Sequence, residues 1–256
     1  ITTSEDDVDR FETSADLEKL IRGFDGVELM YFGEDEKHII PEERIIGFHM
    51  SYHANWLDFW NQDEPALIRE YDDLETCKSA YGGTLDKHRL VEEFQRDYAL
   101  AKRFGAEYMV YHLSDSSIEE SFTWKFRHAD EEVIDAGCAI INEAMAGVED
   151  TGIALLLENL WLPGLTFTRP EMTKRLMDGI KYPNKGIMLD VGHLLHTNLD
   201  IQTQEEGIAY IHTMLDAHGD LCRHVRGVHL NQSITGDYVK GVIANPPDLG
   251  KTYRER

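Results

Sequence analysis

The chain repeats one local pattern along most of its length: a short apolar run, a polar residue that closes it, and a longer stretch with helical periodicity. Apolar runs of this length are typical of strands that are buried on both faces. Their alternation with amphipathic stretches indicates βαβ units, whose strands lie parallel in one sheet. The sequence therefore predicts an α/β fold.

Seven strands and five helices can be located in this pattern. The predicted strands are Ile1–Thr3, Gly26–Tyr31, Ile45–His49, Tyr108–His112, Ile153–Glu158, Gly186–Asp190 and Val225–His229. The predicted helices are Ser14–Gly23, His88–Gly105, Ala129–Gly152, Arg169–Lys181 and Thr203–Gly219. Several of the helical stretches have Ser, Thr or Asp near the start and Gly at the end, which are the usual capping residues.

The spacing of the runs favours a (β/α)₈ TIM barrel, which needs about 30 residues for each strand and helix. Glu158, Asp190 and His229 close successive runs at intervals of about this length, and 256 residues suit one barrel. We therefore expect a single TIM-barrel domain over residues 1–256. Because the chain does not begin with Met and its last residues, Thr252–Arg256, carry neither a strand nor a helix stop, we expect the eighth strand and the extreme N-terminus to be missing from it.

The interval from His49 to His112 is longer by about one unit, which predicts an insertion at about residues 51–85. It leaves the barrel at the carboxyl ends of the strands, where barrel enzymes build their active sites. Because the insertion is rich in aromatic residues, we interpret it as a loop that covers the substrate, with Trp56 and Trp60 in contact with it. The alternative is that these aromatic side chains pack a small core of the insertion itself.

Three strand ends carry the residue types that bind divalent metals. Glu158, Asp190 and His229 close three consecutive runs, and a barrel brings such positions together at its mouth. A carboxylate or imidazole is costly inside a barrel unless a cation or a neighbouring group compensates it. Mixed carboxylate and imidazole ligands suit Zn, Mn or Mg, so we expect these three residues to hold such a metal.

Three further histidines are expected at the same face. His49 and His112 close the two preceding runs, and His193 follows Asp190 beyond a glycine, where we expect the chain to turn sharply. His49 and His112 are predicted to contact substrate, with a second metal or a hydrogen bond to a neighbouring carboxylate as alternatives. His193 is predicted to be catalytic, together with Glu158.

The composition limits the classes of partner. The chain has 25 Lys and Arg against 48 Asp and Glu, a net charge of −23, and such a field repels nucleic acid. It has no run of eighteen apolar residues and no C-x-x-C spacing among its three cysteines, and its first residues lack the basic and apolar regions of a secretory signal. We expect a cytoplasmic protein with a small polyhydroxy substrate and no membrane partner, and a homo-oligomer stays open.

Several segments agree in order and spacing with one superfamily. They are Asp25-Gly26-Val27-Glu28-Leu29, His49-Met50-Ser51-Tyr52, His112, Glu158-Asn159, Asp190-Val191-Gly192-His193 and His229-Leu230-Asn231. Together they resemble the xylose-isomerase-like TIM barrels, which include sugar phosphate isomerases and epimerases and the endonuclease IV group. The resemblance implies a metal on Glu158, Asp190 and His229, with a fourth ligand, a Glu from strand eight, lying beyond Arg256. We also expect Asn159 to bind substrate.

Two departures separate the chain from the best-known members of this superfamily. Sugar epimerases carry a second catalytic Glu shortly after strand five and an Arg after strand seven, where this chain has Trp161 and Asn231 with their neighbours. The endonuclease group matches at His49, His112 and His193, but its Asp-x-His pair after strand seven is missing.

These observations lead to one expected function and two alternatives. The expectation is a metal-dependent isomerase or epimerase that acts on a sugar, an inositol derivative or a related polyhydroxy carbonyl compound. The first alternative is an endonuclease IV-like phosphodiester hydrolase, which the histidine pattern favours and the net charge of −23 opposes. The second is a barrel that binds a sugar without catalysis.

Overall fold

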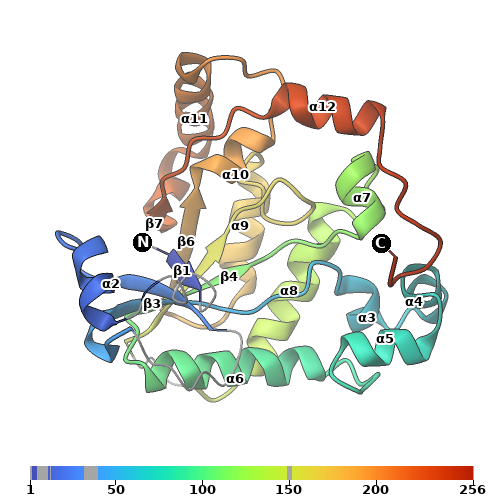
Figure 1. Ribbon diagram of the computed structural model, residues 1–256, viewed down its shortest axis with the longest axis horizontal. Coiled ribbons are helices and arrows are strands. Elements are labelled where there is room, and N and C mark those ends of the chain that lie inside the picture. The colour runs from blue at the N-terminus through green and yellow to red at the C-terminus, as the bar shows by residue number, and fades with distance from the viewer. Residues whose placement is uncertain (1, 5–10, 12, 32–39, 149–151, 256) are drawn as a thin grey trace.

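A computed structural model describes residues 2–4, 11, 13–31, 40–148 and 152–255 of the chain. Seven parallel strands form one sheet in the order β1 to β7, the order of a (β/α)₈ barrel (Figure 1). They are β1 (Thr2–Ser4), β2 (Val27–Met30), β3 (Ile45–His49), β4 (Tyr108–His112), β5 (Ala154–Glu158), β6 (Lys185–Asp190) and β7 (Val225–His229). The predicted α/β barrel fold is confirmed. Among the described residues, no eighth strand joins β7 to β1.

The helices that were predicted correspond to five of those observed. These are α2 (Ser14–Leu20), α6 (Arg89–Arg103), α8 (Asp130–Ala144), α9 (Pro170–Gly179) and α11 (Gln204–His218). The predicted end of α8 runs through residues 149–151, which lie outside the described residues. The pattern missed six short helices: α3 (Leu57–Asn61), α4 (Glu64–Tyr71), α5 (Leu74–Ala80), α7 (Ile118–Thr123), α10 (Val191–His196) and α12 (Gly236–Ala244).

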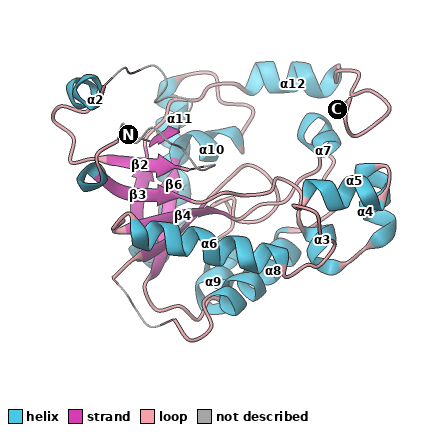
Figure 2. Cartoon of the chain, turned by 60° about the horizontal axis from the view of Figure 1, so that its bottom comes forward, coloured by secondary structure: helices cyan, strands magenta, loops and turns pink. Residues whose placement is uncertain are grey.

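The outward face of the sheet packs against α6, α8 and α9 (Figure 2). Leu155 and Leu157 of β5 point to this side and are fully buried, as are Ile140 and Ile141 of α8. Burying one such side chain stabilises the fold by about 2 kcal/mol. The helices therefore hold the strands in place by apolar packing on the outward face. The polar strand-end side chains lie on the inward face.

The inward side chains are arranged in layers, because alternate residues of a strand point to the same face. Val110, Leu156 and Met188 form an apolar cluster inside the barrel. Two residues further along β4 and β5, the inward side chains are His112 and Glu158. Each strand therefore delivers its last inward residue to the mouth, above an apolar floor.

The insertion after β3 is helical rather than an open loop. It contains α3, α4 and α5, which lie on the side of the molecule toward which the strands point (Figure 1). The last part of the chain lies against it, since the backbone N–H of Tyr253 donates to Asp72 at 2.6 Å and the ring of Tyr253 lies 4.8 Å from that of Tyr71.

Within the described ranges, no helix is both long and apolar enough to cross a bilayer.

Candidate metal centre

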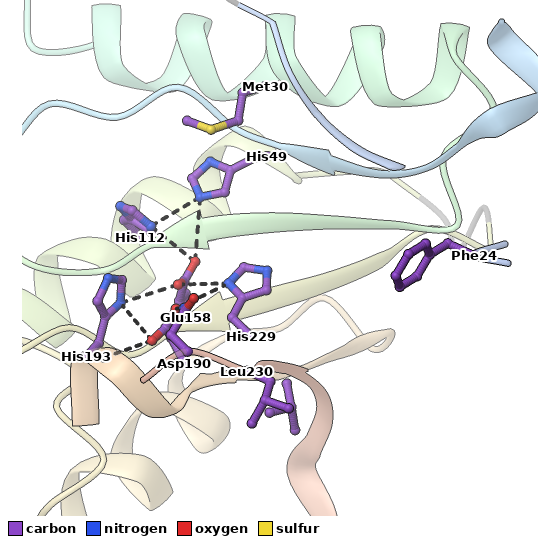
Figure 3. Close-up of a pocket in the computed structure, with 11 residues that line it drawn as sticks. Phe24, Met30, His49, His112, Glu158, Asp190, His193, His229 and Leu230 are labelled. Carbon is purple, nitrogen blue, oxygen red and sulfur yellow. Dashed lines mark hydrogen bonds and ion pairs between the residues drawn. The ribbon is translucent and has the colours of Figure 1, made fainter. Parts of the chain in front are cut away.

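Glu158 is the centre of a cluster of ionisable side chains at the mouth of the barrel (Figure 3). Its Oε2 lies 3.1 Å from His112 Nε2 and 3.6 Å from His49 Nε2. Its Oε1 lies 3.0 Å from His229 Nδ1 and 3.3 Å from His193 Nδ1. Glu158 is 1% exposed. Four imidazoles from four segments thus converge on one buried carboxylate.

The electrostatics of the cluster follow from this convergence. Burial by itself raises the pKa of Glu158, but hydrogen bonds from His112, His193, His229 and His49 outweigh it and hold the pKa far below its usual range. Burial lowers the pKa of His229, and its bonds to Glu158 and Glu28 more than reverse this, raising the pKa to about 10. Glu158 is therefore ionised at neutral pH, and His229 is a cation in the absence of a metal.

Asp190 is the second buried carboxylate of the site, and it begins α10. Its Oδ1 accepts the backbone N–H of His193 at 2.8 Å, which caps the helix. Its Oδ2 accepts from Asn231 Nδ2 at 2.8 Å and lies 3.7 Å from His229 Nδ1. The sharp glycine turn expected before His193 is not present, because α10 starts at Val191. Gly192 instead provides space, since a Cβ there would lie 2.8 Å from Asn231 Cβ.

Asn159 is placed differently from the expectation that it binds substrate. It is fully buried, its Nδ2 donates to the carbonyl of Asp190 at 3.0 Å, and its Oδ1 accepts from the Asp190 N–H at 2.9 Å. Its own carbonyl accepts from His193 Nδ1 at 2.9 Å. With both ends of its amide engaged, Asn159 fixes the backbone of Asp190, and its carbonyl holds the ring of His193.

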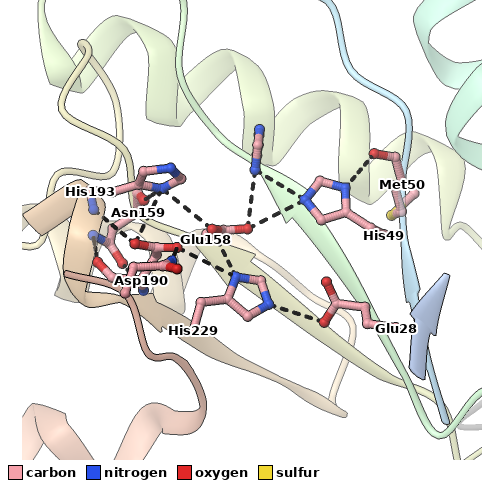
Figure 4. A network of polar contacts seen from close by, with 10 residues as sticks. Glu28, His49, Met50, Glu158, Asn159, Asp190, His193 and His229 are labelled. Carbon is pink, nitrogen blue, oxygen red and sulfur yellow. Dashed lines mark hydrogen bonds and ion pairs between the residues drawn. The ribbon is translucent and has the colours of Figure 1, made fainter. Parts of the chain in front are cut away.

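His49 and His112 form a pair beside Glu158. Their Nε2 atoms are 3.2 Å apart, and His49 Nδ1 donates to the Met50 carbonyl at 3.0 Å (Figure 4). Because Nδ1 is engaged by this carbonyl, His49 presents its Nε2 to the site. His112 Nδ1 is buried, and no partner for it is found among the described residues. Burial lowers the pKa of His112 and so favours the neutral ring that a metal requires.

The donor set fits a divalent metal ion. Two groups of potential ligands have their donor atoms within 4.8 Å of one another, His49 with His112 and Glu158, and Glu158 with Asp190 and His193. Atoms bound to one ion by bonds of about 2.1 Å lie about 3.0–3.5 Å apart. The distances from His229 Nδ1 to Glu158 Oε1 and Asp190 Oδ2, 3.0 and 3.7 Å, fall close to this range. Carboxylate and imidazole ligands together suit Zn or Mn.

Trp56 and Trp60 are buried in the insertion, so they do not line the mouth as expected. Trp56 is 3% exposed and donates its Nε1–H to the Ser114 carbonyl at 2.7 Å. Trp60 is 9% exposed and has the ammonium of Lys87 4.5 Å from its ring. Their neighbour Phe59 is fully buried and stacks on Tyr81 at 3.6 Å. The alternative reading, that these aromatic residues pack a core of the insertion, describes them correctly.

Two residues at the site were not predicted. Tyr52 is 47% exposed, and its ring lies 4.4 Å from that of His112, so it is the aromatic side chain of the insertion that reaches the histidines. Glu28 is buried inside β2, and its Oε2 lies 3.1 Å from His229 Nε2. A signal for each was present in the sequence: Tyr52 follows a strand-end histidine by three residues, and Glu28 interrupts an apolar strand.

The cluster opens into a cavity of about 750 Å³. One side of the cavity is made by the ionisable residues described above. The lining also includes the apolar side chains of Phe24, Met30, Val228 and Leu230, together with Asn231. None of the described residues that line it is Lys or Arg. The cavity therefore has the size and polarity for a small neutral or carbonyl-containing molecule next to the metal ligands.

Comparison with known proteins identifies the family. A family model described as xylose isomerase-like TIM barrel matches residues 17–241. A search of curated proteins found no match. The fold is similar to that of an L-ribulose 3-epimerase, with a TM-score of 0.50 and 13% identity over 99% of this chain and 89% of the other. It is also similar to the 3-keto-D-glucoside 4-epimerase of E. coli, with a TM-score of 0.49 and 14% identity over 87% and 75%.

A further solved structure, a xylose isomerase domain protein from Planctomyces limnophilus, has a TM-score of 0.42 and 16% identity over 89% of this chain and 71% of the other. At 13% identity, the L-ribulose 3-epimerase supports the fold alone. The match to the family model is of another kind, because it spans most of the chain and includes all the strand ends that form the cluster. The chain therefore belongs to the xylose isomerase-like TIM barrel family.

Proposed function

We propose that the protein is a divalent-metal-dependent isomerase or epimerase that acts on a sugar, an inositol derivative or a related polyhydroxy carbonyl compound. The observation that carries the proposal is that His229 Nδ1 lies 3.0 Å from Glu158 Oε1 and 3.7 Å from Asp190 Oδ2, and that all three residues line the 750 Å³ cavity. These three residues would hold Zn, Mn or Mg. The bound ion would act as a Lewis acid toward a carbonyl or an adjacent hydroxyl of the substrate.

His193 is the group that we assign to proton transfer. Its Nδ1 is engaged by Glu158 at 3.3 Å and by the Asn159 carbonyl at 2.9 Å, which leaves Nε2 to exchange a proton with a substrate carbon. Burial lowers the pKa of His193, and the bond to Glu158 and the charge of Asp190 raise it above its usual value. Glu158 is a poor proton acceptor by comparison, because its pKa is held far below the usual range. We therefore assign Glu158 to metal binding.

The cavity supports a small uncharged substrate better than a phosphodiester. Binding several phosphates requires Lys or Arg, and the described lining of the cavity has neither, on a chain with a net charge of −23. The similarity in fold to an L-ribulose 3-epimerase agrees with a sugar substrate. Tyr52, at the edge of the histidine cluster, has an exposed ring that could lie on the apolar face of a sugar.

The second candidate function is metal-dependent phosphodiester hydrolysis. One observation favours it: the two Nε2 atoms of His49 and His112 lie 3.2 Å apart beside Glu158 Oε2, which offers ligands for a second ion. Ions about 3.5–4 Å apart are typical of hydrolases that cleave phosphodiesters. The number of ions bound per chain therefore separates the two candidates.

The test combines metal analysis with a substrate screen. The metal content of the purified protein is measured by mass spectrometry, and proton exchange next to the carbonyl of ketoses, inososes and aldoses is followed by NMR in D₂O. We expect one tightly bound ion per chain and exchange with at least one sugar, both lost in Asp190→Asn and retained in Glu120→Gln. Glu120 is a suitable control because it is equally buried but lies in α7.

The other outcomes of this test are equally informative. Two ions per chain together with cleavage of a model phosphodiester would replace the proposal by the hydrolase. Binding of a sugar without proton exchange at any carbon would indicate a barrel that binds its ligand without catalysis. A protein that binds no divalent metal contradicts the proposal altogether.

A further inference from the structure

Glu28 is a carboxylate in the middle of an otherwise apolar strand. It lies in β2 between Val27 and Leu29, and it is 3% exposed. A buried carboxylate is costly unless hydrogen bonds and neighbouring charge compensate it. Figure 4 shows Glu28 facing His229, and its Oε2 lies 3.1 Å from Nε2 of that ring. The imidazole therefore touches two carboxylates, Glu28 through Nε2 and Glu158 through Nδ1.

The contact crosses the interior of the barrel. In the sheet, β2 pairs with β1 and β3, whereas β7 pairs with β6 alone. The hydrogen bond from His229 to Glu28 therefore joins two strands that have no backbone ladder between them. Together with the pairing of His229 to Asp190 in the β6–β7 ladder, this side-chain contact fixes the direction of the His229 ring.

Glu28 is itself held from the other side by Tyr108 of β4. The Tyr108 hydroxyl hydrogen-bonds to the carboxylate of Glu28. Gly47 lies between them in the sheet, paired with Glu28 on one side and with Tyr108 on the other. A Cβ at Gly47 would lie 2.3 Å from Cζ of Tyr108, so only a glycine lets the tyrosine ring cross β3 at this level. Tyr108, Glu28, His229 and Glu158 thus form one continuous polar chain beneath the mouth.

We propose that Glu28 is a positioning residue of the metal centre, which accepts the Nε2–H of His229 and thereby presents Nδ1 to the metal. A neutral imidazole has one N–H and one lone pair, so fixing the proton on Nε2 leaves the lone pair on Nδ1. Metal-binding histidines commonly donate their second N–H to a carboxylate in this way, and loss of that partner typically weakens metal binding 10–100-fold. This inference rests on the metal site of the proposed function.

The first experiment measures zinc affinity of the metal-free protein in competition with a chromophoric chelator. We expect Glu28→Ala to weaken zinc binding 10–100-fold. Glu28→Gln keeps an acceptor oxygen for Nε2–H and should recover most of the affinity. Tyr108→Phe keeps the ring over Gly47, removes only the hydroxyl, and should have a smaller effect than Glu28→Ala. Glu120→Gln is the matched control and should leave zinc affinity unchanged.

The second experiment asks whether Glu28 acts through His229. In a His229→Ala background, Glu28→Ala should cause no further loss of zinc affinity, since the two residues form one unit. In the zinc-loaded wild type, ¹⁵N chemical shifts should report a protonated Nε2 and a metal-bound Nδ1 for His229. If Glu28→Ala does not fold, Glu28→Gln and Tyr108→Phe together with the ¹⁵N spectrum decide the question.

The outcomes separate this inference from the function on which it rests. A wild-type protein that does not bind zinc contradicts both. Zinc binding that His229→Ala weakens and the Glu28 variants leave unchanged overturns only the role of Glu28. An equal loss from Glu28→Ala in both backgrounds, or a zinc-bound Nε2 in the spectrum, overturns it as well.

Discussion

The mouth of the barrel and the insertion after β3 both carry buried ionisable residues, but they arrange them differently. Around the insertion, two buried carboxylates have partners of their own: Asp58 of α3 pairs with His128 at 3.0 Å, and Asp115, which follows β4, accepts two backbone N–H groups at the start of α3. At the mouth, four imidazoles share one carboxylate, Glu158, within 3.6 Å.

The difference shows how a structural use of buried charge can be told from a chemical one. A buried carboxylate with dedicated donors is fully compensated, and it stabilises a particular local structure. A carboxylate that four imidazoles share depends for its compensation on protonated rings or on a bound metal ion. We therefore interpret the insertion as part of the scaffold and the mouth as the binding site of the proposed function. The predictions below test this distinction, beginning with the largest effect.

Replacing Glu158 at the mouth and Glu120 of the scaffold, each by Gln, should give the largest contrast in metal affinity. Glu158→Gln removes the carboxylate shared by all the potential ligands, so we expect metal affinity to fall at least about 1000-fold, or about 4 kcal/mol, with loss of turnover. Glu120→Gln removes the partner of Arg127 and should cost about 1–3 kcal/mol of stability with unchanged metal affinity. Calorimetric metal titration and denaturant unfolding of both variants check this, and equal metal affinities would remove the distinction.

Truncating a buried aromatic of the insertion should affect stability alone. Trp56→Ala leaves a cavity where a nearly fully buried indole packed, and it removes the hydrogen bond to Ser114. We expect a loss of about 3–5 kcal/mol in the free energy of unfolding, with unchanged metal affinity. Urea unfolding followed by tryptophan fluorescence measures the loss. A normal unfolding midpoint combined with a raised KM would instead restore the idea that Trp56 covers the substrate.

Removing the metal should destabilise the mouth and leave the insertion folded. At a free metal concentration 100 times the Kd, binding to the folded state adds about 2.7 kcal/mol. For a chain of this size, this corresponds to a fall of roughly 5–10 °C in Tm when a chelator is added. Differential scanning calorimetry with and without chelator provides the measurement. An unchanged Tm would mean that the imidazoles compensate the charge of Glu158 without a metal ion.

The pH dependence of the insertion should give the smallest effect. The hydrogen bond to Asp58 raises the pKa of His128 despite partial burial. Because the folded pKa lies above the unfolded value of about 6.5, the stabilisation is complete below pH 6.5 and is lost as the pH rises through the folded pKa. His128→Gln should therefore cost about 1–2 kcal/mol at pH 6 and less once the pH exceeds the folded pKa of His128. A cost that does not change with pH would show that the pair is uncharged.

Local sequence patterns were enough to predict the parts of the fold that repeat. Each strand from β2 to β7 lies within two residues of its predicted bounds, because short apolar runs and capping residues are local signals. The strand-end positions of Glu158, Asp190 and His229 followed directly from the barrel, since parallel strands deliver their last inward side chains to one place. The six short helices, of five to nine residues, were missed because at most two and a half turns give only a weak helical period.

The sequence alone thus determined which strand-end residues reach the mouth of the barrel. The tertiary structure decided what each of them does there and which side chains of the insertion join them. Asn159 was expected at the substrate and instead holds Asp190, while Trp56 and Trp60 were expected at the mouth and are buried in the insertion. Glu28 is a partner of His229 across 201 positions of sequence. Such roles depend on which strands and helices meet in space, and no local period or spacing contains that information.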